Sequence, residues 1–162
     1  LAGMVLSYRD LIRYMAKESD NTAFNISRRV LGQEKIDNLI KAVGMKNTAV
    51  IGEDQKTTPA DIGLFFQRLY QGSLVSQKSR DELLDYLTDT LYEEHLAAGV
   101  PDGTEVSHKY GRELHVVNDA GIVFAEDPYV AVILSKGVVE SEAHRALPAI
   151  SKIIYENRFV EN

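Results

Sequence analysis

The sequence predicts one domain of the α/β class, of the α+β type, with a helical region at about residues 1–98 and antiparallel strands closed by a C-terminal helix at 99–162. Apolar residues recur at helical spacing up to about His95, and three short strand-like segments follow. Only short turns separate these segments, which implies antiparallel neighbours. A chain of 162 residues is long enough to bury one sizeable core, so both regions are assigned to the same domain.

The composition is that of a globular protein and excludes several function classes. Apolar residues make up 44% of the chain and charged residues 26%, and the net charge is −6 without any block of Lys and Arg. We therefore expect no nucleic-acid partner, and no apolar run approaches the roughly 20 residues that span a bilayer. The absence of cysteine excludes disulfides and thiolate chemistry. The four histidines do not fall at metal-ligand spacing, so neither a metal nor another cofactor is expected.

Three helices are predicted near the N-terminus. Ser7 and Asp10 form a capping box that starts a helix ending near residue 17. The second helix covers about residues 21–31 and the third about residues 34–43, each followed by glycine. The residues expected on the inner faces are Leu11, Ile12, Met15, Ala23, Ile26, Val30, Ile36, Leu39 and Ile40.

Three further helices are predicted from their capping residues. Thr58 caps a helix whose first residue is Pro59, Ser76 caps the next, and Ser141 caps the C-terminal one. Pro148 predicts a kink or an irregular turn in the C-terminal helix. The apolar residues expected inside are Ile62, Phe65, Phe66, Leu69, Leu83, Leu84, Leu87, Leu91, Leu147, Ile150, Ile153 and Ile154.

Three strands are predicted between these helices, at about residues 105–110, 116–124 and 129–135. Gly111 marks the first turn. Residues 130–134 are apolar on both faces, so we expect helices to cover both sides of the sheet.

Ser19-Asp20-Asn21 is the first stretch that carries chemistry. A serine hydroxyl can accept one proton and pass on another, and an amide two residues later can hold a carbonyl and a lysine at once. The alternative is structural, with Asp20 as the N-cap of the second helix.

Lys109-Tyr110-Gly111 is the second such stretch, at the end of the first predicted strand. The lysine would aim a fixed positive charge into a cleft at the strand edge, and the glycine would let a ligand approach the backbone closely. The alternative is an ordinary edge-strand lysine followed by a turn glycine.

The order of these stretches along the chain resembles the penicillin-recognising serine hydrolases, most closely the class A β-lactamase-like family, whose pattern includes S-x-x-K, S-D-N and K-T-G. The resemblance extends over about residues 6–155. It implies a β-lactamase and transpeptidase-like fold, acyl transfer through a serine ester on β-lactams or D-alanyl peptides, no cofactor, and a secreted or cell-envelope location. The stretches that carry it are Ser19-Asp20-Asn21, Thr57–Asp61, Gly99–Gly103, Lys109-Tyr110-Gly111 and Asn118–Val123.

The resemblance implies catalytic roles for three residues. Ser19 would relay a proton toward the leaving nitrogen. Asn21 would bind the substrate's side-chain amide and help to fix the catalytic lysine. Lys109 would attract the substrate carboxylate, which is electrostatic work in a water-poor cleft.

The resemblance also implies that the next three residues bind substrate. Gly111 lies in the strand edge beside the cleft, and Arg112 would give a backbone N–H to the oxyanion hole. Tyr110 stands where the family has threonine or serine, and its bulky phenol cannot give the same short hydroxyl contact to a carboxylate.

Two further departures concern the chemistry. No S-x-x-K occurs anywhere in the sequence. In the family that motif precedes S-D-N by several dozen residues, so we expect the nucleophile, its lysine base and the first strands in a missing N-terminal segment. The chain alone should then be inactive and should expose an apolar sheet face or groove. Glu53 does not match the glutamate that class A enzymes use in deacylation, which favours a peptidase-like or slow hydrolase.

Two alternatives remain open on the sequence. One is a non-catalytic cell-envelope binding module that uses the same fold, favoured by Tyr110 and the missing nucleophile. The other is an unrelated helical domain in which the motifs occur by chance.

Overall fold

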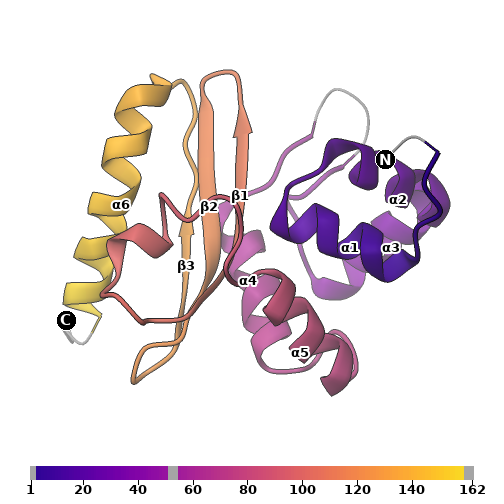
Figure 1. Cartoon of the computed structure of the whole chain (residues 1–162), viewed down its shortest axis with the longest axis horizontal. Helices are drawn as coiled ribbons and strands as arrows, with labels where there is room; N and C mark the ends of the chain where they lie inside the picture. Colours follow the sequence, from indigo (N-terminus) through magenta and orange to yellow (C-terminus); the bar gives the residue numbers. More distant parts are fainter. Residues whose placement is uncertain (1–2, 51–54, 159–162) are drawn as a thin grey trace.

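The computed structural model describes residues 3–50 and 55–158. The sheet lies between α6 on one side and the other α-helices on the other side (Figure 1). In chain order the elements are α1 (Tyr8–Lys17), α2 (Asn21–Leu31), α3 (Gln33–Val43), α4 (Pro59–Tyr70), α5 (Gln77–Tyr86), η1, a short 3₁₀ helix (Ala97–Gly99), β1 (Val106–Glu113), β2 (Val116–Val123), β3 (Tyr129–Ile133) and α6 (Glu140–Asn157).

The sheet is antiparallel with strand order β1-β2-β3, as predicted. The turn predicted at Gly111 is wrong, because β1 continues to Glu113 and Gly111 pairs with Asn118 inside the ladder. The chain reverses at Leu114 and His115 instead. His115 has a φ of 59°, so it supplies the left-handed backbone conformation of this turn.

Helices cover both faces of the sheet, which confirms the prediction from residues 130–134. On one face, α6 and η1 bury Leu96, Val117, Val123, Ala131 and Leu147. On the other face, α1, α4 and α5 bury Ala16, Phe66, Leu69, Leu84 and Ile122. The alternation of side chains along each strand therefore sends neighbouring residues into two different cores.

The buried face of α6 differs from the prediction. The helix begins at Glu140, and no side chain caps it, so the assignment of Ser141 as N-cap is wrong. It runs through Pro148 and buries Ala143, Leu147 and Ser151, whereas Ile150 and Ile153 are 40% and 59% exposed. The small side of the helix faces inward because η1 comes very close: a Cβ at Gly99 would lie 2.3 Å from Cβ of Ser151.

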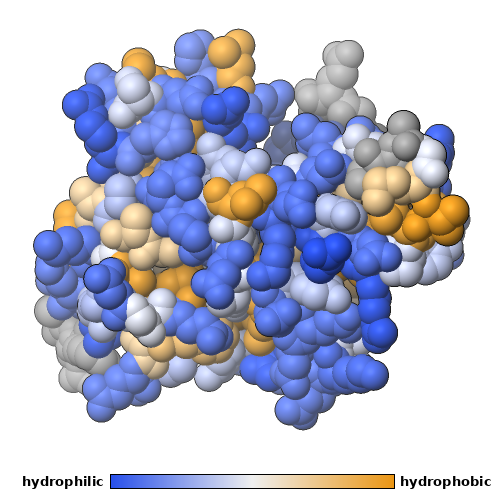
Figure 2. Space-filling model, viewed as in Figure 1, coloured by the Kyte–Doolittle hydropathy of each residue, from blue (hydrophilic) through white to orange (hydrophobic). Residues whose placement is uncertain are grey.

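Three apolar residues expected inside the helical region lie at the surface. Val30 and Leu39 are 50% and 56% exposed. α2 packs on α1, and α3 packs on α2 and α4, which leaves part of the surface of α2 and α3 uncovered by the described residues. Figure 2 shows an apolar patch at the right, in the region of the N-terminal segment and the first helices. Leu91 is 69% exposed because α5 ends at Tyr86, so Leu91 lies outside the helix and not on its buried face.

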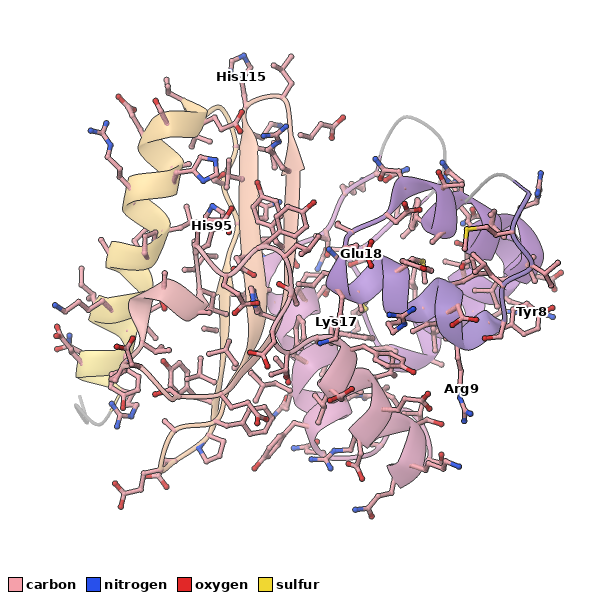
Figure 3. All side chains as sticks on the ribbon, in the orientation of Figure 1. Tyr8, Arg9, Lys17, Glu18, His95 and His115 are labelled. Atoms are coloured by element: carbon pink, nitrogen blue, oxygen red, sulfur yellow. The ribbon has the colours of Figure 1, made fainter. Side chains whose placement is uncertain are left out.

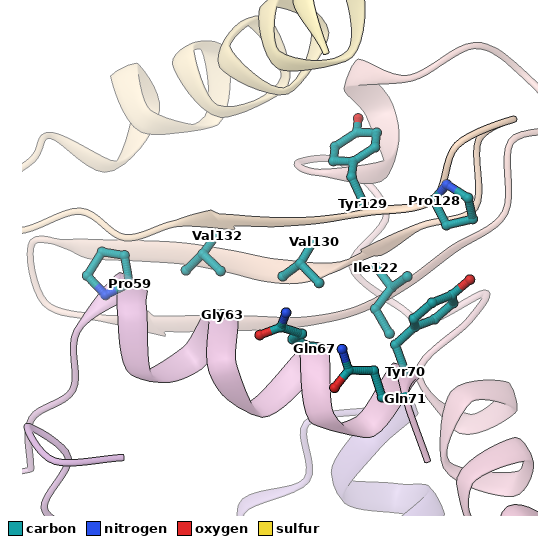
Figure 4. Close-up of a pocket in the computed structure, with 10 residues that line it drawn as sticks. All are labelled: Pro59, Gly63, Gln67, Tyr70, Gln71, Ile122, Pro128, Tyr129, Val130 and Val132. Carbon is teal, nitrogen blue, oxygen red and sulfur yellow. The ribbon is translucent and has the colours of Figure 1, made fainter. Parts of the chain in front are cut away.

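An open groove of about 540 Å³ lies along the junction of α4 and β3 (Figure 4). Gly63 and Gln67 of α4 line one wall, and the half-buried Val130 and Val132 of β3 line the other. β3 pairs with β2 along one edge, and no other described strand pairs with its second edge. This groove has both polar and apolar residues in its lining, so the exposed apolar face expected from the sequence stays a prediction.

Two smaller points complete the fold. Glu53 lies outside the described residues, and Ala49 and Lys56 on either side of it form an isolated antiparallel bridge. Among the described helices, none is both long enough and apolar enough to cross a bilayer.

Candidate active site

The structure brings together two of the predicted site residues that are 90 positions apart in the chain. Nζ of Lys109 donates a hydrogen bond to Oγ of Ser19 at 2.6 Å and another to the backbone oxygen of Tyr110 at 2.8 Å. Hydrogen bonds from a charged donor are short and strong. The middle of β1 and the α1–α2 connection therefore meet at one polar contact.

The backbone around Ser19 holds the hydroxyl in place. Ser19 has a φ of 52°, which is unusual for a residue other than glycine. On either side, the N–H groups of Glu18 and Asp20 both bond to the backbone oxygen of Tyr14. The carboxylate of Asp20 accepts from the N–H of Ala23 at 2.6 Å and caps α2, so the structural interpretation of Asp20 is confirmed.

The segment after α5 braces the end of α1. Nζ of Lys17 donates to the backbone oxygen of Thr88 at 2.7 Å, and the N–H of Leu91 returns a bond to the backbone oxygen of Lys17. Figure 3 shows Lys17 and Glu18 at the end of α1 that faces the sheet. These contacts fix the α1–α2 connection relative to β1, because the N–H of His108 bonds to Leu87 in the same segment.

Lys109 is partly removed from water. Burial lowers the pKa of its ammonium group, and the negative charge of Asp119 opposes this effect. A cation that has lost part of its hydration interacts more strongly with an anionic ligand than an exposed one. The site is thus suited to attract a carboxylate.

A buried polar network lies next to Lys109 on the same strand. The imidazole of His108 contacts the carboxylate of Asp119 at 2.8 Å and that of Glu93 at 3.1 Å, and His108 and Asp119 are both fully buried. Burial lowers the pKa of His108, but the hydrogen bonds and charges of the two carboxylates outweigh it and raise the pKa above its ordinary value. The sequence did not predict this network, and its only signal was polar residues within otherwise apolar strands.

The structure places the other predicted site residues differently. The ring of Tyr110 is buried on the opposite face of β1 from Lys109, stacked between the rings of Tyr92 and His95 with centroid distances of 4.8 and 4.7 Å. A ligand on the Lys109 side would therefore meet the backbone of Tyr110 and not its phenol. The role of Tyr110 in substrate binding stays a prediction.

Gly111, Arg112 and Asn21 are all accessible. A Cβ at Gly111 would meet no other atom within 4 Å, so the strand is open there. The side chain of Arg112 is exposed and pairs with Glu140 at 2.6 Å, which leaves only its backbone for the predicted role. Asn21 is exposed at the first position of α2. Their functional roles stay predictions.

Metal-ligating side chains gather elsewhere in the described part of the chain. Glu94, His95 and His144 each place one ligand atom within 4.8 Å of the others, near α6. The spacing of these residues in the sequence did not predict the cluster, because His144 joins it from a separate helix.

Known proteins resemble this chain in sequence and in fold. The β-lactamase FAR-1 of Nocardia farcinica (strain IFM 10152) is 30% identical over 148 residues, which cover 81% of this chain and 45% of FAR-1. The solved structure of PBP-A is 26% identical with a TM-score of 0.88 and covers 94% of this chain and 62% of PBP-A. A variant of PBP-A, 27% identical over 94% of this chain and 62% of its own, was solved as an acyl-enzyme complex with penicillin G and gives a TM-score of 0.86.

A more distant structure shows the fold alone. A variant of the class A β-lactamase of the last common ancestor of Gram-negative bacteria has a TM-score of 0.90 at 22% identity, over 99% of this chain and 68% of its own. The chain therefore spans about half of its curated relative and about two thirds of these structures. The family model described as "Beta-lactamase enzyme family" matches residues 1–157, which removes the alternative of an unrelated domain. The chain belongs to the β-lactamase enzyme family and is class A-like within it.

Proposed function

We propose that the protein containing this chain is a β-lactamase-like serine hydrolase that forms a serine ester with β-lactams or D-alanyl peptides. The observation that carries the proposal is the 2.6 Å hydrogen bond from Lys109 to Ser19. Two family motifs from distant parts of the chain converge on this contact. If the two motifs had occurred by chance, their side chains would not be expected to contact each other in the folded chain.

Ser19 is the proton relay in this proposal. Its oxygen accepts the hydrogen bond from Lys109, so its own O–H is free to donate to the leaving nitrogen of the substrate. A nearby cation also makes it easier for the serine oxygen to carry negative charge while a proton is in transit. Asn21, exposed at the start of α2, binds the side-chain amide of the substrate.

Lys109 binds the carboxylate of the substrate. Partial burial strengthens this attraction, because the ammonium group has already lost part of its hydration. β1 is an edge strand of the described sheet, so its outer edge can take up a substrate backbone beside Gly111. The backbone N–H of Arg112 contributes to the oxyanion hole, while its side chain pairs with Glu140.

The nucleophilic serine and its lysine base are assigned to a part of the protein outside this chain. The support is that the sequence contains no S-x-x-K and that the relatives are longer than this chain. A serine needs an adjacent base to act as a nucleophile. A secreted or cell-envelope location belongs to the same proposal and rests on the family.

The test is covalent labelling of the full-length protein with penicillin G, followed by intact-mass measurement. We expect a penicilloyl adduct whose formation is slowed at least tenfold in Ser19→Ala. Ser141→Ala is the matched control, because Ser141 lies in the exposed first turn of α6, away from the Lys109 contact. Saturable but purely reversible binding would refute the serine ester and support the non-catalytic binding module.

A further inference from the structure

Two histidines face each other between the sheet and α6. Nε2 of His95 and Nδ1 of His144 are 2.7 Å apart, and the ligand atoms of Glu94, His95 and His144 all lie within 4.8 Å of one another. Figure 3 shows His95 between the strands and α6. None of the three residues takes part in the proposed acyl transfer, so the cluster needs an explanation of its own.

The position of His95 is fixed from several sides. Its ring is fully buried and stacks on Tyr110 with an interplanar angle of 17°. The next residue, Leu96, donates its N–H to Asp119 at 2.9 Å and accepts a hydrogen bond from Ser151 at 2.7 Å. The imidazole is therefore held in one orientation before any ligand arrives, which lowers the entropic cost of binding.

The orientation of His144 is set by a carboxylate on the same helix. Nε2 of His144 lies 3.4 Å from Glu140, one turn earlier, and Glu140 is itself held by Arg112 at 2.6 Å. If Nε2 carries the proton toward Glu140, Nδ1 presents a lone pair toward His95. A histidine that gives one ring N–H to a carboxylate and offers the other nitrogen is the usual arrangement of a metal ligand.

The hydrogen bonding of the histidine pair is incomplete. The two facing nitrogens share one proton, and Nδ1 of His95 is buried without a hydrogen-bond partner among the described residues. A buried unpartnered nitrogen in a native protein calls for a specific reason.

We propose that Glu94, His95 and His144 bind one zinc ion. The ligands are Nε2 of His95, Nδ1 of His144 and the carboxylate of Glu94, with water in the fourth position. The zinc ion takes the place of the proton between the two rings, and this proton moves to Nδ1 of His95, so both histidines bind as neutral imidazoles. With Zn–N bonds of about 2.0–2.1 Å at a tetrahedral angle, the nitrogens must move from 2.7 Å to roughly 3.3 Å apart.

The exposure of the ligands provides a route for the ion. Glu94 is exposed and His144 is 33% exposed, whereas His95 forms the buried floor of the site. Two imidazoles and one carboxylate favour zinc, copper or nickel and disfavour magnesium and calcium, which require oxygen ligands. The bound ion would join the segment before η1 to α6.

Isothermal titration of zinc chloride into the untagged, chelator-treated protein tests the proposal. We expect one saturable site per chain that is lost in His144→Ala. Glu94→Gln should weaken zinc binding by at least tenfold. Mutating a residue that only hydrogen-bonds a metal ligand typically lowers metal affinity by about 10–100-fold, and loss of a ligand itself should cost no less. His115→Asn is the matched control, since this exposed histidine lies in the β1–β2 turn and asparagine tolerates its positive φ.

Any one of the following results would overturn the proposal. They are the absence of saturable zinc binding up to millimolar concentration, unchanged affinity in His144→Ala, and equal competition by magnesium. If circular dichroism shows that His144→Ala is unfolded, Glu94→Gln serves as the test instead, because the side chain of Glu94 is exposed. Unchanged affinity in folded Glu94→Gln would refute the three-ligand site. Cobalt substitution adds a spectroscopic test, because four-coordinate Co²⁺ bound to these nitrogens absorbs strongly in the visible range.

Discussion

Replacing Lys109 with methionine should slow acylation of the full-length protein without unfolding it. Methionine keeps an unbranched side chain of similar length but removes the charge and the donor to Ser19. The ammonium group makes hydrogen bonds of 2.6 Å to Ser19 and 2.8 Å to the backbone of Tyr110. A substrate carboxylate bound by Lys109 would also lose its cation.

The magnitude follows from the kind of interaction lost. A hydrogen bond to a charged group contributes about 1.5–3 kcal/mol, and each 1.36 kcal/mol of activation free energy is a factor of about ten in rate. Lys109→Met should therefore lower the second-order acylation rate constant by roughly 10- to 150-fold. The free energy of unfolding should change by less than about 1 kcal/mol, because the lost hydrogen bonds are offset by relief of the desolvation that lowers the pKa of Lys109.

The assay is time-resolved intact-mass measurement of the penicilloyl adduct, with folding checked by circular dichroism. The double variant Lys109→Met with Ser19→Ala should be much less impaired than the product of the two single effects, because the two side chains act through one contact. Equal acylation rate constants for wild type and folded Lys109→Met would remove Lys109 from the site and refute the reasoning.

Four further outcomes are expected. The 162-residue chain alone should form no penicillin adduct by intact mass, since its sequence lacks S-x-x-K; a stable adduct on any serine would contradict this. Tyr110→Thr should lower the free energy of unfolding in urea by about 2–4 kcal/mol, because it empties a buried ring position; an unchanged midpoint would show that the ring is not packed. Asp119 and Glu93 raise the folded-state pKa of His108, so the protonated imidazole stabilises the fold fully below its ordinary pKa of 6.5, and this stabilisation is lost as the pH rises through the folded-state pKa. Urea unfolding at a series of pH values should show the free energy of unfolding decline over this range. An equal decline in His108→Gln would exclude His108 as its source. Finally, the chain alone should associate through the groove between α4 and β3, and light scattering that gives the monomer mass at every concentration would argue against it.

The starts of several helices were predictable because their signals are local. The capping box of Ser7 and Asp10 and the pair Thr58-Pro59 each form at the predicted position. A capping side chain bonds to backbone groups two or three residues away, so its effect needs no knowledge of the tertiary structure. The C-terminal helix was the exception, since Val139 caps it without a side-chain bond.

The buried faces were less predictable because contacts distant in sequence decide them. In α6 the close approach of Gly99 selects Ser151 for the interior and leaves Ile150 and Ile153 at the surface. Apolar residues at helical spacing predict an inward face, but the spacing does not show which other element will pack against it. Val30 likewise has the right period but lies on a helix face that no described element covers.

The candidate site was also only partly predictable from the sequence. The contact between Ser19 and Lys109 was anticipated only through the family resemblance, because nothing local relates residues 90 positions apart. The network of Glu93, His108 and Asp119 has neither a motif nor a regular spacing. Two neighbouring strands and a loop must first come together before these charges meet.

The left-handed backbone conformation of Ser19 creates a conflict between the stability of the protein and its candidate activity. A residue with a Cβ in this region costs roughly 1–2 kcal/mol, whereas glycine adopts it freely. Ser19→Gly should therefore make the fold more resistant to heat while it deletes the hydroxyl that contacts Lys109. Directed evolution of this protein for thermostability alone would tend to enrich glycine at position 19 and yield robust but inactive variants. Any such campaign needs an activity screen in every round.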